Sequence, residues 1–242
     1  METEQIRIQK FISDCGIMSR RAAEREIELG HVTVNDVNAN LGDKIIPGKD
    51  TVKLCGKVIG KNSDKKRYIM LNKPVGYLTS MSDDRGRKCV SELVADVGAR
   101  VYPCGRLDMA SEGLLILTND GEFANILTHP HNGHIKTYNV KIKGEVTADI
   151  IKALSEPMII DDYEIKPVKV WLVSSKRDYT ILGFGLSEGR NRQIRKMCEK
   201  FSLEVLSLRR IAIDDVMLGK LPLGEWRDLS KYEVNLLKKG SK

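Results

Sequence analysis

The chain has 242 residues, of which 41% are hydrophobic and 30% are charged, and its formal net charge is +7. This length allows one or two domains with a substantial core, and the basic balance suits a polyanionic partner. No segment approaches the roughly 18 consecutive apolar residues of a membrane span, and the N-terminus lacks a signal-peptide pattern, so we expect a cytoplasmic protein.

The cysteine pattern argues against disulfide bonds. The chain has five cysteines, an odd number, and none lies in a Cys-x-x-Cys pair. We therefore expect reduced thiols rather than a disulfide framework or a cysteine-based zinc site.

Residues 6–29 are predicted to form two short helices. Ser19 is placed to cap the second helix, which should end at Gly30. Short strands are expected at 32–35 and 50–54.

Arg20, Arg21 and Arg25 lie near the start of the second helix. One interpretation is that these side chains grip RNA phosphates. The other is that they are solvated and paired with Glu24 and Glu28. Residues 1–60 hold nine basic and nine acidic residues and are therefore neutral, so both interpretations stay open.

The basic, polar stretch 61–67 has no apolar periodicity and is typical of a linker. A strand is predicted at 68–71, followed by a turn at Asn72-Lys73-Pro74-Val75-Gly76.

The stretch Gly105-Arg106-Leu107-Asp108 precedes an apolar run from Leu114 to Leu117 that predicts a buried strand. Asp108 lies in a turn held by that strand, which is where reactive groups are often presented. The alternative is that its carboxylate only accepts backbone N–H groups of the turn.

His129, His131 and His134 follow a short helix predicted at 122–127. Their spacing invites comparison with a metal site, but no carboxylate or thiolate is interleaved at ligand spacing. We therefore predict no metal site here.

Residues 136–142 alternate polar and apolar side chains, which predicts a strand carrying Lys136 and Tyr138. A helix is expected at 147–154, and 158–184 are expected to form several strands with turns at 161–162 and 176–178.

The stretch 185–197 is a Gly-containing turn leading into a basic helix. Ile194, Met197, Cys198 and Phe201 share one helical face and should pack inward. The glycine-rich start and its arginines suit phosphate binding. The alternative for Arg195 is a weak surface pair with Glu199.

Together these motifs resemble, in order, those of the RNA pseudouridine synthases, closest to the ribosomal RNA enzymes of the RsuA/RluB type. The matching residues are Asn72–Gly76, Gly105–Asp108 with Gly113–Gly121, Lys136-x-Tyr138 and Gln193-Ile194-Arg195. Residues 6 to about 59 resemble the alpha-L RNA-binding domain, on Ser19–Glu24 and Val32–Asn35.

The resemblance implies an α+β fold: an alpha-L RNA-binding domain at 1–60, a basic linker at 61–67, and a catalytic domain with a mixed, mainly antiparallel sheet at 68–242. It implies no cofactor, no nucleotide and no metal, with ribosomal RNA as partner of a monomer. The catalytic residues it implies are Asp108, Tyr138 and Arg195, with Arg195 paired to Asp108. The RNA-binding residues implied by the arginine cluster and the motifs are Arg20, Arg21, Arg25, Lys73, Arg106, Lys136, Leu186, Arg190, Asn191, Arg192, Gln193 and Lys196.

The expected activity is isomerisation of uridine to pseudouridine in ribosomal RNA, with large-subunit RNA favoured and a small-subunit target left open. The sequence leaves open attack on C6, attack on C1′ or a glycal route. Two alternatives are a non-catalytic ribosome assembly factor and a glycosidic hydrolase. The hydrolase would need a second carboxylate, for which Glu112 and Asp120 are near in sequence.

Overall fold

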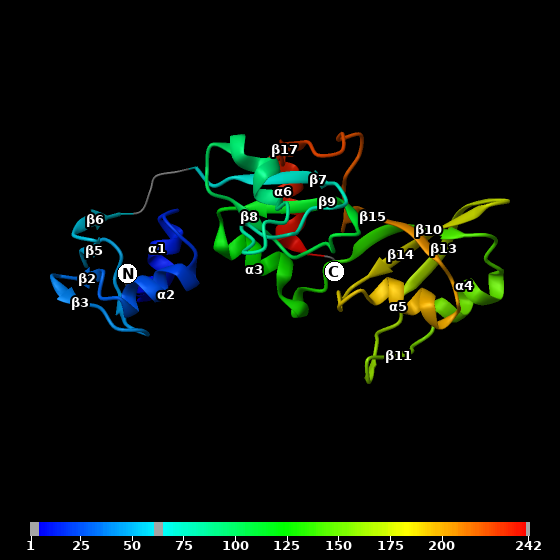
Figure 1. The fold of residues 1–242 in the computed structure, drawn as a ribbon, viewed down its shortest axis with the longest axis horizontal. Coiled ribbons are helices and arrows are strands. Elements are labelled where there is room, and N and C mark those ends of the chain that lie inside the picture. Colours follow the sequence, from blue (N-terminus) through cyan, green and yellow to red (C-terminus); the bar gives the residue numbers. More distant parts are fainter. Residues whose placement is uncertain (1–4, 61–64, 241–242) are drawn as a thin grey trace. The chain divides into compact units, whose positions relative to one another are not determined.

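The computed structural model describes residues 5–60 and 65–240 (Figure 1). The chain divides into two compact units, residues 1–66 with Asn119–Gly121, and Arg67–Thr118 with Glu122–Lys242. The domain boundaries at 60 and 68 stay predictions, and residues 61–64 of the expected linker lie outside the described residues.

The first unit is a helical pair beside a small antiparallel sheet of order β3-β2-β5-β6. The hydroxyl of Ser19 accepts from the backbone N–H of Ala22 at 3.1 Å, which confirms the predicted cap. Ile8, Ile12 and Ile45 are buried at its centre. The elements are β1 (Ile6–Arg7), α1 (Ile8–Asp14), α2 (Arg20–Glu28), β2 (Val32–Val34), β3 (Val37–Asn38), β4 (Lys44–Ile45), β5 (Val52–Leu54) and β6 (Lys57–Ile59).

The second unit is built on one large sheet of order β13-β14-β10-β15-β9-β7-β17, with β16 on β15 and β8 on β9. β15 pairs with β9 in parallel, whereas the other neighbours pair antiparallel, so the predicted mixed, mainly antiparallel sheet is confirmed. Its strands are β7 (Tyr68–Lys73), β8 (Tyr102–Pro103), β9 (Glu112–Thr118), β10 (Lys136–Lys143), β13 (Lys169–Lys176), β14 (Tyr179–Leu186), β15 (Val205–Ile213), β16 (Val216–Met217) and β17 (Trp226–Asp228).

The remaining elements cover this sheet or extend from it. A separate hairpin of β11 (Ile159–Ile160) and β12 (Tyr163–Glu164) turns at Asp161 and Asp162, as predicted. The helices are η1 (Val90–Val97), α3 (Gly121–Thr128), η2 (Pro130–Asn132), α4 (Ala148–Ser155), α5 (Gln193–Lys200) and α6 (Lys231–Lys239).

The apolar run 114–117 lies in β9 because that strand is covered on both faces. Leu114 and Ile116 face a core shared with α3 and α6, whereas Leu115 and Leu117 face a core shared with η1. A strand buried on both sides loses the polar–apolar alternation of an exposed sheet. The predicted buried strand is therefore confirmed.

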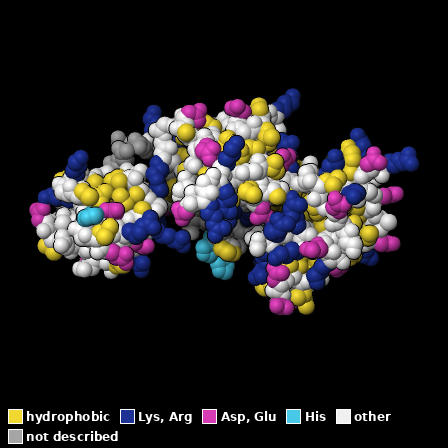
Figure 2. Space-filling view, viewed as in Figure 1, with side chains coloured by type: hydrophobic (Ala, Val, Ile, Leu, Met, Phe, Trp, Pro, Cys, Tyr) yellow, Lys and Arg dark blue, Asp and Glu magenta, His cyan; other side chains and the backbone are white. Residues whose placement is uncertain are grey.

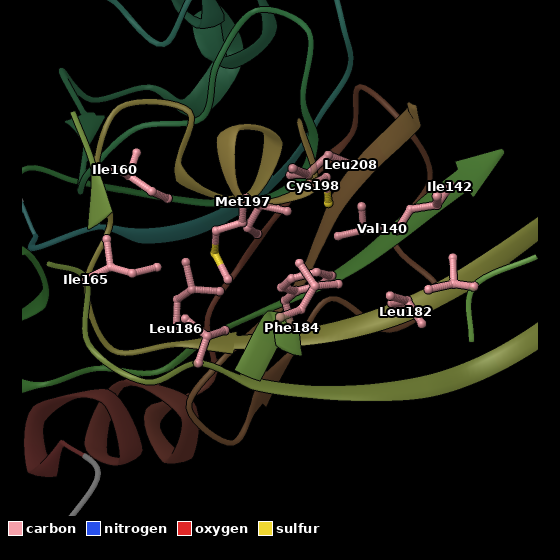
Figure 3. Close-up of a cluster of buried hydrophobic side chains, with 14 residues drawn as sticks. Val140, Ile142, Ile160, Ile165, Leu182, Phe184, Leu186, Met197, Cys198 and Leu208 are labelled. Atoms are coloured by element: carbon pink, nitrogen blue, oxygen red, sulfur yellow. The ribbon is translucent and has the colours of Figure 1, made fainter. Parts of the chain in front are cut away.

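Helix α5 packs on the β10–β14 part of the sheet (Figure 3). Ile194, Met197 and Cys198 are buried, and Phe201 is partly buried against the same cluster, as the helical spacing predicted. Burial raises the pKa of the Cys198 thiol to about 12, so this cysteine is a core residue. Among the described residues, no helix has the length and apolar character to cross a membrane.

Candidate active site

A pocket of about 320 Å³ opens in the second unit, at the C-terminal end of β14 and the start of α5. This volume lies in the range of ~300–1,000 Å³ typical of small-ligand sites. Its apolar floor includes Leu186 and Leu208. All three residues predicted to be catalytic line it: Asp108, Tyr138 and Arg195. So do six predicted to bind RNA: Arg106, Leu186, Arg190, Asn191, Arg192 and Gln193.

Asp108 is exposed in the loop between β8 and β9. Among the described residues, no hydrogen bond or ion pair includes its carboxylate. The alternative in which this side chain only caps backbone N–H groups of the turn is therefore not what the geometry shows.

The backbone around Asp108 is held from both sides. The hydroxyl of Thr79 donates to the carbonyl oxygen of Leu107 at 2.6 Å. The backbone N–H of Gly76 donates to the carbonyl oxygen of Met109 at 2.8 Å. The ammonium of Lys73 donates to the carbonyl oxygens of Pro74, Asp108 and Ser111 at 3.0, 3.2 and 2.9 Å.

Two arginines complete this support. Arg210 is buried and donates to the carbonyl oxygens of Leu114 and Arg106 at 2.7 and 3.5 Å. Arg195 donates to the carbonyl oxygen of Ala110 at 2.8 Å. Every carbonyl oxygen from 106 to 111 therefore accepts a hydrogen bond, which presents the carboxylate from a fixed loop.

Gly113 is required where β9 meets β15. Its φ of +108° is unfavourable for other residues, and a Cβ there would lie 2.2 Å from the carbonyl oxygen of Arg210. The glycine lets the two strands approach next to the Asp108 loop.

Lys73 corrects one sequence prediction. It was expected to contact RNA, but it is fully buried, and its three ammonium hydrogens are matched by three backbone carbonyl acceptors. Its position leaves no donor for a phosphate. Lys73 instead positions the loop that carries Asp108.

Lys73 should also leave a mark on stability. Burial lowers its pKa from 10.5 to about 8, against the opposing charge of Asp108. At a pH between these two pKa values, Lys73 keeps its proton in the unfolded chain and releases it in the folded protein. This lysine therefore makes the free energy of unfolding rise with pH. The free energy of unfolding, measured with urea, should therefore rise more in the wild type than in Lys73→Met. From pH 7.5 to 10 this gain should be at most about 3 kcal/mol. Lys152→Met, which changes an exposed lysine, should follow the wild type; the same slope in Lys73→Met would contradict the assignment.

Tyr138 lies on β10, with Phe184 and Arg210 opposite it on the neighbouring strands. Its ring is partly buried and packs against two hydrophobic clusters of the second unit. This packing restricts the ring and leaves one part of it facing the cavity.

Arg195 makes neither of the two ion pairs considered from the sequence. Within the part of the chain that the structure describes, no ion pair joins it to Asp108 or to Glu199. It donates to the carbonyl oxygens of Ala110 and Val205, at 2.8 and 3.4 Å. Burial, and then the charge of Arg192, lower its pKa, while Asp108 raises it. The expected direct pairing with Asp108 is corrected to a contact with the same loop.

The basic loop before α5 is held by the β11–β12 hairpin. The guanidinium of Arg190 lies 3.2 Å from the centre of the Tyr163 ring. Lys196 is paired with Asp161 of the hairpin and does not line the pocket. Glu188 accepts from the backbone N–H of Lys166 at 3.0 Å.

The other predicted RNA-binding residues are not among those that line the pocket. Lys136 is half-buried on β10, and burial lowers its pKa. Arg20, Arg21 and Arg25 are exposed on α2, and no ion pair among the described residues includes them. Among the described residues, the alternative pairing of these arginines with Glu24 and Glu28 is therefore not seen. On the face in Figure 2, Lys and Arg side chains gather over the second unit between the regions of α3 and α5.

The three histidines do not converge. His134 is buried, and its ring nitrogens contact the carboxylate of Asp214 and the carbonyl oxygen of Ile126. His129 and His131 stack on each other at the surface, with ring centres 5.2 Å apart.

Sequence reasoning missed the roles of Thr79 and Arg210. A signal for Arg210 exists: it shares the inward phase of β15 with Leu208 and Ala212, and an arginine on a buried strand face needs acceptors. Nothing local marks Thr79, because its partner lies 28 residues away.

An exposed carboxylate on a fixed loop, facing a pocket rimmed by arginines, is suited to an enzyme that acts on RNA. Residues 67–200 match the family of RNA pseudouridylate synthases, and the chain belongs to that family.

The chain is 38% identical over 235 residues to the ribosomal large subunit pseudouridine synthase B of Bacillus subtilis (strain 168), covering 96% of this chain and 95% of the relative. It is 40% identical over 230 residues to the dual-specificity RNA pseudouridine synthase RluF of Escherichia coli (strain K12), covering 95% of this chain and 77% of the relative. A crystal structure of a pseudouridylate synthase matches with a TM-score of 0.69 at 27% identity, covering 96% and 99%. The family and fold inferred from the sequence motifs are confirmed.

Proposed function

We propose that this protein converts specific uridines of ribosomal RNA to pseudouridine, with Asp108 as the nucleophile. The observation that carries the proposal is the exposed Asp108 carboxylate, held over a pocket shared with Tyr138 and Arg195. The relative from Bacillus subtilis is named for the large ribosomal subunit, which supports large-subunit RNA as the substrate.

The reaction breaks the N1–C1′ bond of uridine, turns the uracil and joins C5 to C1′, so substrate and product have the same atoms. A base inside a helix must first be flipped out, which costs a few kcal/mol. Tyr138 stacks on the extruded uracil and recovers ~1–3 kcal/mol. Arg106, exposed at the pocket rim, fills the space that the base leaves.

The lining of the pocket favours this reaction over hydrolysis. Of the described residues that line it, Asp108 is the only carboxylate. Glu112 instead lies 3.9 Å from Arg209, and Asp120 pairs with Lys66. A glycosidase normally uses two carboxyl groups. A non-catalytic assembly factor would not need the fixed Asp108 loop.

Pseudouridine mapping of ribosomal RNA tests the proposal. Cells without the protein should lose pseudouridine at one or a few positions, and wild-type protein, but not Asp108→Asn, should restore them. The purified protein should modify the same positions in large-subunit RNA without releasing uracil. Unchanged maps, or free uracil as product, would refute the synthase assignment.

Arg20, Arg21 and Arg25 test the expected role of residues 1–60 in RNA binding. Replacing all three by Gln should raise KM and leave kcat unchanged, because the side chains are exposed and belong to the first unit. The dependence of log affinity on log salt should flatten by about 0.7–0.9 per lost phosphate contact.

The matched control replaces three exposed lysines of the same unit, Lys44, Lys49 and Lys57, by Gln. It makes the same change in charge and should have a smaller effect. Equal effects of the two triple variants would mean that only net charge matters.

A further inference from the structure

Three metal-ligating side chains of different kinds meet in the first unit. Glu26 lies in the last turn of α2, His31 follows that helix, and Cys55 lies in the turn between β5 and β6. One ligand atom of each lies within 4.8 Å of the others. Within residues 5–60 and 65–240, this is the one such group of three.

The backbone already brings the three residues together. The backbone N–H of His31 donates to the carbonyl oxygen of Glu26 at 3.0 Å, and the backbone N–H of Cys55 donates to the carbonyl oxygen of His31 at 2.8 Å. Nδ1 of His31 lies 2.8 Å from the Glu26 carboxylate. Bonds of ~2.0–2.3 Å to a shared ion therefore require side-chain rotation rather than refolding.

Cys55 is unusual in this chain. It is exposed, whereas Cys15, Cys89, Cys104 and Cys198 are buried. Its φ is +47°, in a hairpin turn with Gly56 where Asn or Gly is favoured. Most other non-glycine residues with positive φ in the described chain are Asn or Asp. This backbone conformation is therefore unfavourable for cysteine. An exposed thiol at such a position indicates that the sulfur atom itself has a function.

We propose that Glu26, His31 and Cys55 bind a zinc ion. A thiolate, an imidazole and a carboxylate are zinc ligands, whereas Mg²⁺ and Ca²⁺ prefer sites made of oxygens. On binding, the Cys55 thiol loses its proton to solvent, and the thiolate and carboxylate balance the two charges of the ion. Water completes the tetrahedron. The ion joins the C-terminal end of α2 to the β5–β6 turn, and Arg20 and Arg21 lie at the opposite end of this helix.

Metal titration of the full-length protein tests this site. The protein is stripped with a chelator, kept reduced with a phosphine, and titrated with Zn²⁺ by calorimetry and with Cd²⁺ by ultraviolet absorption. We expect one ion per chain, proton release, and a thiolate-to-cadmium band. Cys55→Ser should abolish the band, and His31→Gln and Glu26→Gln should each weaken zinc binding at least ~10-fold.

The exposed pair His129 and His131 supplies the control, because two neighbouring histidines also attract zinc. His131→Gln should bind zinc as the wild type does. Zinc binding that survives Cys55→Ser, or that is lost in His131→Gln, would overturn the proposal. So would a wild-type protein that binds no zinc at micromolar concentration.

Thiol labelling gives an independent readout. Cys55 should react fastest in the metal-free protein, because the other four thiols are buried. One equivalent of Zn²⁺ should slow this reaction at least ~10-fold, since a metal-bound thiolate is no longer free to attack. An unchanged labelling rate would show that the sulfur is not a ligand.

Discussion

Asp108→Asn should lower pseudouridine formation at least ~1,000-fold, the scale seen when a nucleophile is removed. An amide has the shape of the carboxylate but carries no charge to attack with. The loop should keep its conformation, because its carbonyl oxygens are held by Lys73, Thr79 and Arg195 rather than by the Asp108 side chain. Melting temperature and RNA affinity should therefore stay close to wild type.

The matched control for this variant is Glu112→Gln, which removes a negative charge four residues along, at the start of β9. It should keep most of the activity, since Glu112 does not line the pocket. Single-turnover assays at saturating RNA separate chemistry from binding. Turnover by Asp108→Asn above a few per cent of wild type would reject Asp108 as the nucleophile.

Arg195→Met should be the second most damaging change, with kcat lowered ~100–1,000-fold, the scale for loss of one positioned donor. The guanidinium donates to the Ala110 carbonyl, two residues after Asp108, and it lines the same pocket. Removing it frees the loop on that side and takes a positive charge from the site. In the proposed function, residues other than Arg195 contact the RNA phosphates. KM should therefore change less than kcat.

Two further variants discriminate between the explanations. Arg195→Lys keeps the charge but loses the planar fork, so its kcat should be intermediate. Glu199→Gln should have no effect, because Glu199 is exposed and forms no ion pair with Arg195. Wild-type activity in Arg195→Met, or a loss in Glu199→Gln, would return Arg195 to the role of a surface residue.

Local patterns predicted most of the regular structure. The capped helix at Ser19, the buried strand around Leu114–Leu117 and the inward face of α5 depend on residues close in sequence. The C-terminal helix α6 was an exception, since no helix was predicted at Lys231–Lys239. A Ser230–Glu233 capping box starts this helix, and Val234 and Leu237 are buried. The three lysines of this helix made the sequence appear polar, so its apolar face was not recognised.

The sequence by itself determined the family, the predicted nucleophile and most of the pocket lining, because these residues lie in short ordered motifs. Only the tertiary structure decided what supports them. Lys73 moved from an RNA contact to a buried donor because the Asp108 loop folds over it, 35 residues away in sequence. Arg195 reaches Ala110 across 85 residues. Glu26, His31 and Cys55 show no ligand spacing along the chain, since it is a backbone hydrogen bond from Cys55 to His31, residues far apart in sequence, that completes the group. Partners this distant leave no periodic signal, so their chemistry appears only once the chain has folded.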